Sequence, residues 1–296
     1  MPSREHEAIV EFFRARPIGF STVQDSRAMF EQIARFFPVP PDVRTEPTQA
    51  GGVPAEWVRV PESCTDRTLL YLHGGSYALG SLNTHRELVA RLARAIGACA
   101  LHVDYRLAPE QRFPAAVEDA TAAYRWLLAS GRAPGSIAIA GDSAGGGLAL
   151  ATLLALRDAG EPLPAACFCL SAWTDLAGTG DSARPDTRVD DPMIDHGGIR
   201  ATGRTYLGGA DPRTPLASPL YGDFTGLPPM LLLVGSREVL LDDSTRVAAR
   251  ARAAGVEVEL EVSPGLIHVW PYFGPDMPES RDAVARIAEF TRKLLP

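Results

Sequence analysis

Hydrophobic residues recur with two different periods along this chain of 296 residues. Short apolar runs of strand length alternate with longer stretches in which apolar positions return every three or four residues, as in amphipathic helices. The runs predict strands over 54–60, 68–73, 98–103, 136–140, 165–171, 230–235 and 256–262. The longer stretches predict helices over 84–97, 115–130, 143–159, 243–254 and 279–294. This alternation predicts an α/β fold with a mainly parallel sheet covered by helices on both faces.

The first residues stand outside this alternation. Residues 3–37 predict two amphipathic helices that are broken at Pro17-Ile18-Gly19. The sequence PVPPDV that follows stops any helix, since proline cannot continue one. We therefore expect a helical segment over 1–40 ahead of the main domain, which would occupy 41–296.

A second irregular stretch lies between two expected core strands. Residues 174–229 are rich in Gly, Pro and Asp, with no clear strand and one candidate helix near 196–207. An insertion of this length is more often a lid or a binding element than a plain connection. We expect a cap insertion at about 175–210.

Charge and composition exclude several classes of function. The formal net charge is −7 and the sequence pI is about 5.4, which argues against nucleic acid or an anionic membrane as a partner. No run approaches the ~20 apolar residues of a membrane span. The N-terminal segment also lacks the apolar core of a signal peptide. These features predict a soluble, cytoplasmic protein.

The four cysteines add no chemistry to this picture. Cys64, Cys99, Cys167 and Cys169 form no CxxC pair, and no histidine cluster lies near them. The last three fall in runs that predict strands. We interpret them as small buried side chains in a reducing compartment, rather than as metal ligands or disulfide partners.

The strongest candidate chemistry is a serine between two glycines. Gly141-Asp142-Ser143-Ala144-Gly145 lies between a predicted strand and a predicted helix. A serine on such a sharp turn projects its hydroxyl clear of the backbone, and the glycines two positions away keep the turn free of bulk. A phosphate-binding loop is the competing interpretation, but the GxxxxGK[ST] pattern is absent. The context predicts a nucleophile at Ser143, with the Ala144 N–H as an oxyanion donor.

A second glycine-containing loop lies about 70 residues upstream. His73-Gly74-Gly75-Ser76 follows a predicted strand directly. By itself this segment could be a simple turn. In a fold with a nucleophile on the turn at Ser143, however, this position is where a loop of oxyanion-binding N–H groups lies. His73 precedes the serine, so the chain order of this fold favours a structural role for it.

An acid and a histidine should follow the serine in the chain. His268 comes just after the last predicted strand, where α/β sheets place their active sites, whereas His196 lies inside the insertion. For the acid, Glu238 is the first candidate after the strand over 230–235. Asp242 and Asp243 remain alternatives, although their place at a helix start explains them as capping residues.

Six segments together resemble the bacterial hormone-sensitive-lipase-like esterases, a carboxylesterase family of the α/β-hydrolase fold. They are HGGS (73–76), DYRLAPE (104–110), GDSAGG (141–146), SAWTDL (171–176), GSREVLLDD (235–243) and LIH (266–268). DYRLAPE and GDSAGG are specific for the family. We expect DYRLAPE to be structural, with Asp104 and Arg106 as an ion pair.

The resemblance implies a catalytic triad of Ser143, Glu238 and His268. It also implies oxyanion donors at Gly74, Gly75, Ser76 and Ala144, and a cap made by the N-terminal helices and the insertion. Two positions depart from the family pattern, because Ser76 replaces a third glycine and the acid is usually aspartate. A Cβ at Ser76 resists positive φ and narrows the site.

These residues predict a serine carboxylesterase that hydrolyses small-molecule esters with short acyl chains through an acyl-enzyme on Ser143, with neither metal nor cofactor. The family resemblance is compatible with a homodimer. We consider Phe20, Phe30, Trp173, Tyr206 and Trp270 as pocket residues, although each is equally explained as an ordinary core aromatic. Alternatives are an amidase or deacetylase of a specific metabolite, a true lipase, or a receptor-like binding protein without catalysis.

Overall fold

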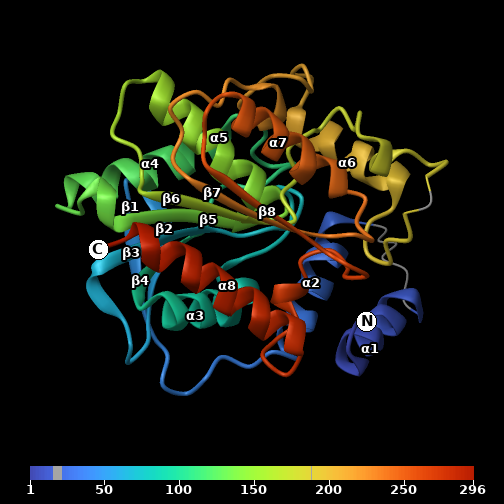
Figure 1. The fold of residues 1–296 in the computed structure, drawn as a ribbon, viewed down its shortest axis with the longest axis horizontal. Coiled ribbons are helices and arrows are strands. Elements are labelled where there is room, and N and C mark those ends of the chain that lie inside the picture. The colour runs from blue at the N-terminus through green and yellow to red at the C-terminus, as the bar shows by residue number, and fades with distance from the viewer. Residues whose placement is uncertain (16–21, 188) are drawn as a thin grey trace.

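The computed structural model of the protein describes residues 1–15, 22–187 and 189–296. Its centre is an eight-stranded sheet in the order β1-β2-β4-β3-β5-β6-β7-β8 (Figure 1). The strands are β1 (Arg44–Ala50), β2 (Val53–Arg59), β3 (Cys64–Leu72), β4 (Ala98–Val103), β5 (Ile137–Asp142), β6 (Ala166–Leu170), β7 (Met230–Gly235) and β8 (Val258–Ser263). Only the β1–β2 and β2–β4 pairs are antiparallel. The predicted α/β fold with a mainly parallel sheet is confirmed.

Helices cover both faces of the sheet, as the alternating pattern predicts. Figure 1 shows α3 and α8 on one face and α4, α5 and α7 on the other, while α1, α2 and α6 gather at one end. The helices are α1 (Arg4–Ala15), α2 (Val23–Ala34), α3 (Leu82–Ile96), α4 (Ala115–Ala129), α5 (Ala144–Asp158), α6 (His196–Leu207), α7 (Leu241–Ala253) and α8 (Pro278–Leu294). The end with α1, α2 and α6 is where the site described below lies.

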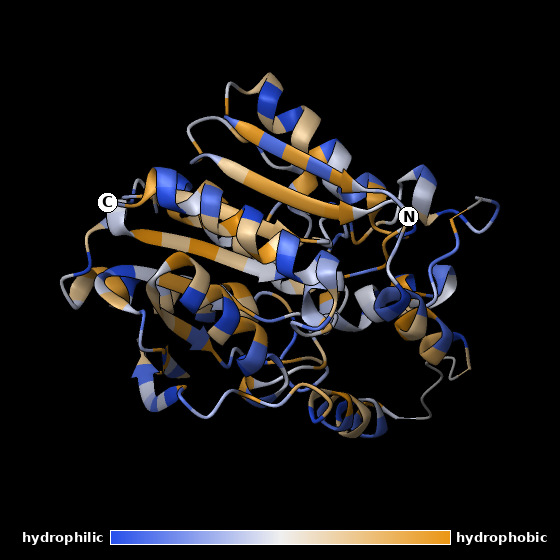
Figure 2. Cartoon of the chain, turned by 60° about the horizontal axis from the view of Figure 1, so that its bottom comes forward, coloured by the Kyte–Doolittle hydropathy of each residue, from blue (hydrophilic) through white to orange (hydrophobic). Residues whose placement is uncertain are grey.

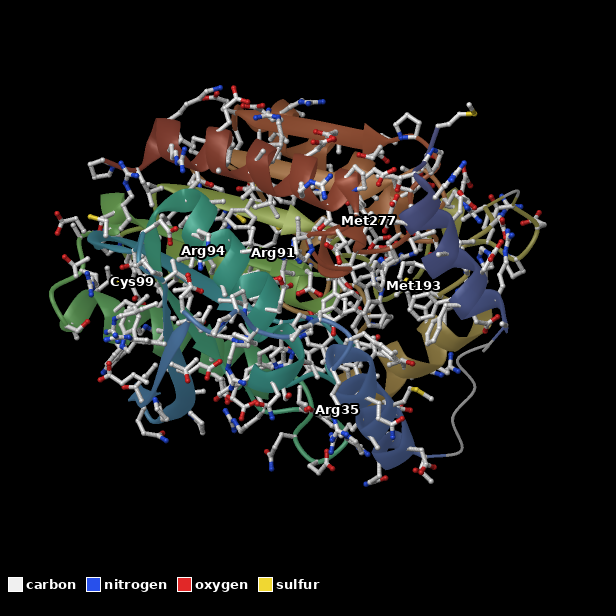
Figure 3. The ribbon with its side chains drawn as sticks, turned by 90° about the horizontal axis from the view of Figure 1, so that it is seen from below. Arg35, Arg91, Arg94, Cys99, Met193 and Met277 are labelled. Carbon is white, nitrogen blue, oxygen red and sulfur yellow. The ribbon has the colours of Figure 1, made fainter. Side chains whose placement is uncertain are left out.

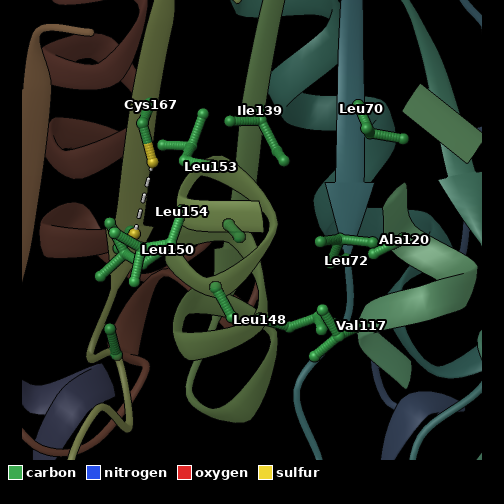
Figure 4. Close-up of a cluster of buried hydrophobic side chains, with 14 of the residues drawn as sticks. Leu70, Leu72, Val117, Ala120, Ile139, Leu148, Leu150, Leu153, Leu154 and Cys167 are labelled. Atoms are coloured by element: carbon green, nitrogen blue, oxygen red, sulfur yellow. Dashed lines mark hydrogen bonds between the residues drawn. The ribbon is translucent and has the colours of Figure 1, made fainter. Parts of the chain in front are cut away.

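The apolar core has two halves, one on each face of the sheet. Along β3, Leu70 and Leu72 pack in the cluster under α4 and α5 (Figure 4), while Leu69 and Tyr71 pack in the cluster under α3 and α8. Successive side chains of a strand point to opposite faces, so a strand buried on both faces reads as a continuous apolar run. Figure 2 shows this contrast between orange inner strands and helices that carry blue positions.

Both irregular stretches are partly as expected. The two N-terminal helices are present as α1 and α2, but their break at Pro17-Ile18-Gly19 lies outside the described residues. The helix expected in the insertion is α6, and the described part of 174–229 contains no strand. No helix in the described ranges has the length and apolar character needed to cross a membrane.

Two details of the fold differ from the sequence predictions. β1 was not expected, because Arg44–Ala50 is a largely exposed, polar edge strand without an apolar run. The expected ion pair between Asp104 and Arg106 is wrong. The Arg106 guanidinium instead binds Asp119 on α4, with Nε 2.9 Å from Oδ1, and also reaches Glu118. This contact fixes the DYRLAPE segment to the neighbouring helix.

Candidate active site

A sharp turn between β5 and α5 carries Ser143. This residue has φ 51° and ψ −120°, a conformation that L-residues rarely adopt. A Cβ on Gly141 would lie 2.3 Å from the carbonyl of Gly145, and a Cβ on Gly145 would lie 2.0 Å from the Leu72 oxygen. The expectation that both neighbours must lack bulk is therefore confirmed, because a side chain at either position would displace the turn.

The structure brings Ser143, His268 and Glu238 into one hydrogen-bonded row. The Ser143 Oγ lies 3.0 Å from His268 Nε2, and His268 Nδ1 lies 2.9 Å from Glu238 Oε2. The residues follow β5, β8 and β7, whose carboxyl ends meet at the same edge of the sheet. Glu238 is fully buried and His268 is 6% exposed. These distances suit proton transfer from a hydroxyl to an imidazole oriented by a carboxylate.

Ser171 holds both the acid and the histidine loop, and the sequence did not predict this role. Its Oγ donates to Glu238 Oε1 at 2.7 Å and accepts the Val269 N–H at 3.0 Å. Glu238 Oε1 also accepts the Gly235 N–H. The SAWTDL motif was the available signal, but a motif alone does not say which of its side chains faces a carboxylate on another strand.

Charge at this row favours a basic imidazole. Burial would lower the pKa of His268, but the hydrogen bond and the negative charge of Glu238 outweigh burial and raise this pKa above its ordinary value. Burial raises the pKa of Glu238, against the hydrogen bonds that His268, Gly235 and Ser171 donate to it. The donors around Glu238 thus compensate a carboxylate that lies away from water.

Asp142 joins the serine turn to the upstream glycine loop. Its Oδ1 accepts the Gly74 N–H at 2.9 Å and the Tyr71 hydroxyl at 2.8 Å, and its Oδ2 lies 3.3 Å from His85 Nε2. Burial would raise the pKa of Asp142, but the charge and hydrogen bond of His85 and the hydrogen bond of Tyr71 lower it. No pattern in the sequence singles out this aspartate, although it precedes the serine directly.

The Asp142 contact changes the set of oxyanion donors. The Gly74 N–H is occupied by Asp142, so it is not free to bind an oxyanion, and one of the four expected donors is removed. Within the described residues, the N–H groups of Gly75, Ser76 and Ala144 donate no hydrogen bond. Gly75 and Ser76 border the same cavity as Ser143. Three N–H groups thus remain available at this edge.

His73 supports the loop, as its position before the serine suggested. Its Nδ1 lies 2.7 Å from the Gly74 oxygen, and its ring stacks on Tyr105 of the DYRLAPE segment with centroids 4.4 Å apart. The Tyr105 hydroxyl donates to the His73 carbonyl at 2.6 Å. Burial, with the neighbouring rings of His85 and His102, lowers the pKa of His73 to about 3. His73 is therefore neutral near pH 7. It supports the loop and does not belong to the Ser143–His268–Glu238 row.

Backbone strain is concentrated at this site. In the described chain, the non-glycine residues with positive φ are Ser76, Tyr77, Ser143, Ser171 and Val269. Ser76 ends the upstream glycine loop and Tyr77 directly follows it, and the other three lie at the serine turn, beside Glu238 and in the histidine loop. Ser76 adopts φ 56° despite its Cβ, so the serine in place of a third glycine is accommodated at a cost. Strained residues of this kind persist where the surroundings fix them, which is typical of functional sites.

A largely apolar cavity of about 180 Å³ opens onto Ser143 and His268. Its walls come from α1, α2, the insertion and the segment after His268, and they include Phe13, Phe30, Met193, Ile194 and Phe273. Figure 3 looks from below onto this region, with Met193 labelled between the N-terminal helices and the insertion. Segments far apart in the sequence therefore enclose one space beside the hydroxyl.

Of the aromatic residues that were considered from the sequence as pocket residues, only some border the cavity. Phe30 lines it, whereas Trp173, Tyr206 and Trp270 are buried elsewhere in the core. Phe20 lies outside the described residues. Tyr272 and Phe273, which complete the wall, lie four and five residues after the candidate histidine. The sequence alone does not show which of the apolar side chains near a histidine loop face a cavity.

The remaining candidates have other surroundings. His196 is the first residue of α6 and does not line the cavity. Asp242 and Asp243 lie in the first turn of α7, as expected, but each also binds the insertion side of the site. Asp242 Oδ2 accepts the Ser182 N–H at 2.9 Å, and Asp243 Oδ2 accepts the Thr174 N–H at 2.6 Å. Neither carboxylate contacts His268, which leaves Glu238 as its partner.

The chain is similar in sequence to known hydrolases. A family model described as "alpha/beta hydrolase fold" matches residues 69–272. The chain is 52% identical over 255 residues to an acetyl-hydrolase of Streptomyces hygroscopicus, which covers 86% of this chain and 83% of that protein. It is 38% identical over 269 residues to an esterase of Acinetobacter venetianus, with 90% and 88% covered.

Solved structures agree with these sequence relatives. A crystal structure of an esterase from the bacterial hormone-sensitive lipase family superimposes with a TM-score of 0.96. That protein is 47% identical to this chain, and the match covers all of both chains. The similarity therefore includes the N-terminal helices and the insertion as well as the sheet.

Proposed function

The chain belongs to the bacterial hormone-sensitive-lipase family of α/β-hydrolases and is a carboxylic ester hydrolase, and from this premise we propose that it hydrolyses short-chain acyl esters through an acyl-enzyme on Ser143. The observation that carries the proposal is the row from Ser143 Oγ to His268 Nε2, at 3.0 Å, and from His268 Nδ1 to Glu238 Oε2, at 2.9 Å. This row ends beside three free N–H groups, an arrangement suited to acyl transfer.

The first half of the reaction forms the acyl-enzyme. The Ser143 oxygen attacks the ester carbonyl while His268 Nε2 takes the hydroxyl proton, and Glu238 stabilises the imidazolium that results. The carbonyl oxygen becomes an oxyanion that the N–H groups of Gly75, Ser76 and Ala144 bind. His268 then returns the proton to the leaving alcohol as the C–O bond breaks. Gly74 contributes by bracing the loop through Asp142 rather than by donating to substrate.

Water repeats the sequence on the acyl-enzyme. His268 takes a proton from the water, the hydroxide oxygen attacks the acyl carbon, and the Ser143 oxygen leaves with the proton that His268 returns. The products are a carboxylic acid and the regenerated serine. Every proton in this cycle moves through one imidazole, so the activity should fall at low pH as that imidazole becomes protonated.

The cavity supports a preference for short acyl chains. At about 180 Å³ it is smaller than the roughly 300–1,000 Å³ clefts that bind drug-sized ligands. We propose that α1 and α2 with the insertion form a cap over it, since Phe13, Phe30 and Met193 close its sides. The name acetyl-hydrolase, given to the Streptomyces relative, points to the same small acyl group.

A series of p-nitrophenyl esters from acetate to dodecanoate tests the proposal. We expect kcat/KM to be highest for two to four carbons and to fall by about tenfold or more at eight carbons, because the longer chain does not fit the cavity. The matched p-nitroanilides should be hydrolysed far more slowly. Equal rates on ester and anilide would favour an amidase. A preference for long-chain emulsions would favour a lipase, and absence of both turnover and organophosphate labelling would favour a binding protein.

Phe273 should set the chain-length limit. Phe273 borders the cavity at Ser143 and also a second cavity of about 300 Å³. Replacing Phe273 by alanine should join the two, and each additional methylene that becomes buried contributes about 0.8 kcal/mol. We expect the ratio of kcat/KM for octanoate over butyrate to rise about tenfold, which corresponds to the burial of about two of the four additional methylenes. Phe36→Ala is the matched control, because Phe36 borders only the second cavity. A ratio unchanged in Phe273→Ala would contradict this limit.

A further inference from the structure

One carboxylate in the insertion contacts both the pocket wall and the loop that carries the candidate acid. Asp191 Oδ1 accepts the N–H groups of Met193, at 2.9 Å, and Ile194, at 3.1 Å. Its other oxygen, Oδ2, accepts the Val239 N–H at 3.0 Å. Asp191 and Val239 are 48 residues apart in the chain, so this side chain joins two separate segments.

Each end of the Asp191 contact reaches a functional part of the site. Met193 and Ile194 line the cavity beside Ser143, and Val239 is the residue directly after Glu238. Figure 3 shows Met193 where the insertion faces the N-terminal helices. A displacement of Asp191 would therefore move the pocket wall or the backbone next to Glu238. The positions of the wall and of the Glu238 loop would then no longer be fixed relative to each other.

Neighbouring contacts reinforce this connection without replacing it. The Ser182 Oγ donates to the Val239 carbonyl at 2.8 Å, which holds the other side of the same peptide segment. Asp190 makes contacts of another kind, because its side chain is 61% exposed and pairs with two arginines, Arg14 of α1 and Arg237, the latter at 2.8 Å. Asp191 is thus the carboxylate that engages the pocket wall, while Asp190 forms surface ion pairs that contribute little.

We propose that Asp191 is a positioning residue that fixes the pocket wall and the Glu238 loop relative to each other, so that a substrate held by Met193 and Ile194 meets a correctly oriented triad. The inference rests on the proposed function of Ser143, Glu238 and His268. Asp191 touches neither the reacting atoms nor the imidazole, and it acts through the backbone on either side of it. Misplacement of a reacting group by about 1 Å can cost about a hundredfold in rate.

The charge of Asp191 gives the proposal a second, separable readout. The charged groups that act on His268 are Glu238, Asp191 and Asp142, and all three raise its pKa, against burial, which lowers it. Removing the negative charge of Asp191 should therefore lower the pKa of His268. A general base with a lower pKa stays deprotonated at lower pH, so the acidic limb of the kcat/KM profile should shift to lower pH.

Asp191→Asn tests both effects, with Asp190→Asn as the matched control. Both Asp191 oxygens accept N–H groups, so the amide NH2 of an asparagine must oppose either Val239 or the Met193 and Ile194 pair. For p-nitrophenyl butyrate we expect kcat to fall between about tenfold and a hundredfold. We also expect the acidic limb to move to lower pH. Asp190→Asn should remain within about twofold of the wild type in kcat, since it loses only ion pairs of a carboxylate that is 61% exposed.

Other outcomes would overturn the inference. Wild-type kcat and an unshifted acidic limb in Asp191→Asn would do so, and so would equal losses in Asp191→Asn and Asp190→Asn. If Asp191→Asn does not fold, as judged by its thermal transition, Asp191→Glu carries the test. It should keep the acidic limb and lose kcat, and unchanged kcat would reject the proposal. Wild-type turnover and organophosphate labelling of Ser143, measured in parallel, show separately whether the proposed function itself holds.

Discussion

Ser143→Ala should abolish hydrolysis of p-nitrophenyl butyrate, with kcat reduced by about 10⁴- to 10⁶-fold. The alanine has no oxygen to attack the carbonyl, and the 3.0 Å contact to His268 Nε2 disappears with the hydroxyl. The residual rate would come from substrate binding and from the free N–H groups near the serine. Steady-state kinetics and mass spectrometry after organophosphate treatment measure the two consequences, lost turnover and lost covalent labelling.

The control for this substitution is Ser130→Ala. Ser130 lies at the exposed end of α4, where its Oγ donates to the Leu127 carbonyl at 2.8 Å. It should keep wild-type kcat and labelling. A Ser143→Ala variant that retained a tenth or more of the wild-type rate would remove Ser143 from the mechanism, and with it the acyl-enzyme. The thermal transition of both variants should stay near that of the wild type, because each loses a single small polar atom.

Glu238→Gln should reduce kcat by about 10³- to 10⁴-fold. Oε1 of Glu238 accepts hydrogen bonds from Ser171 and Gly235, and Oε2 faces His268 Nδ1. A glutamine satisfies both sides only if its NH2 faces the imidazole. His268 must then accept at Nδ1 and carry its proton on Nε2, where it cannot take the proton of Ser143. The enzyme would be folded but held in an unproductive tautomer.

Asp242→Asn distinguishes this effect from a general loss of negative charge. Asp242 was an alternative acid by sequence, and in the structure it binds the Ser182 N–H and not the imidazole. We expect a loss in kcat of less than about tenfold, since the acceptor oxygen can be kept by the amide. Equal losses in Glu238→Gln and Asp242→Asn would show that the acid has been assigned to the wrong residue. Kinetics at several pH values measure both variants.

Local geometry made part of the fold and of the candidate site predictable from the sequence. The alternation of strand and helix patterns placed the parallel part of the sheet, and the spacing of Gly141 and Gly145 required a sharp turn at Ser143. Both follow from steric rules that act within a few residues. The order of serine, acid and histidine along the chain predicted His268 and favoured Glu238, the first acid after its strand, with Asp242 and Asp243 as alternatives. The structure places Glu238 and His268 in one hydrogen-bonded row with Ser143.

The rest depended on contacts between distant segments. Ser171 and Asp191 act through hydrogen bonds to Glu238, Val239 and the pocket wall, and no periodicity marks such partners. The predicted partner of Arg106 was a near neighbour in the chain, while the actual partner lies on α4. β1 was missed because an exposed edge strand needs no apolar face. Sequence patterns indicate burial and turns, whereas contacts of this kind depend on the relative positions of two segments that are distant in the chain.

The bond from the Gly74 N–H to Asp142 has a consequence for engineering by recombination. Asp142, the residue before Ser143, also fixes the upstream loop through the Gly74 N–H. Residues 73–77 and 141–145 should therefore be exchanged together. A chimaera can take one of these segments from a relative and the other from this chain. The Gly74 N–H donor and the Asp142 acceptor then come from two different proteins. Crossovers that keep the two segments from a single parent should yield active progeny more often than crossovers that separate them.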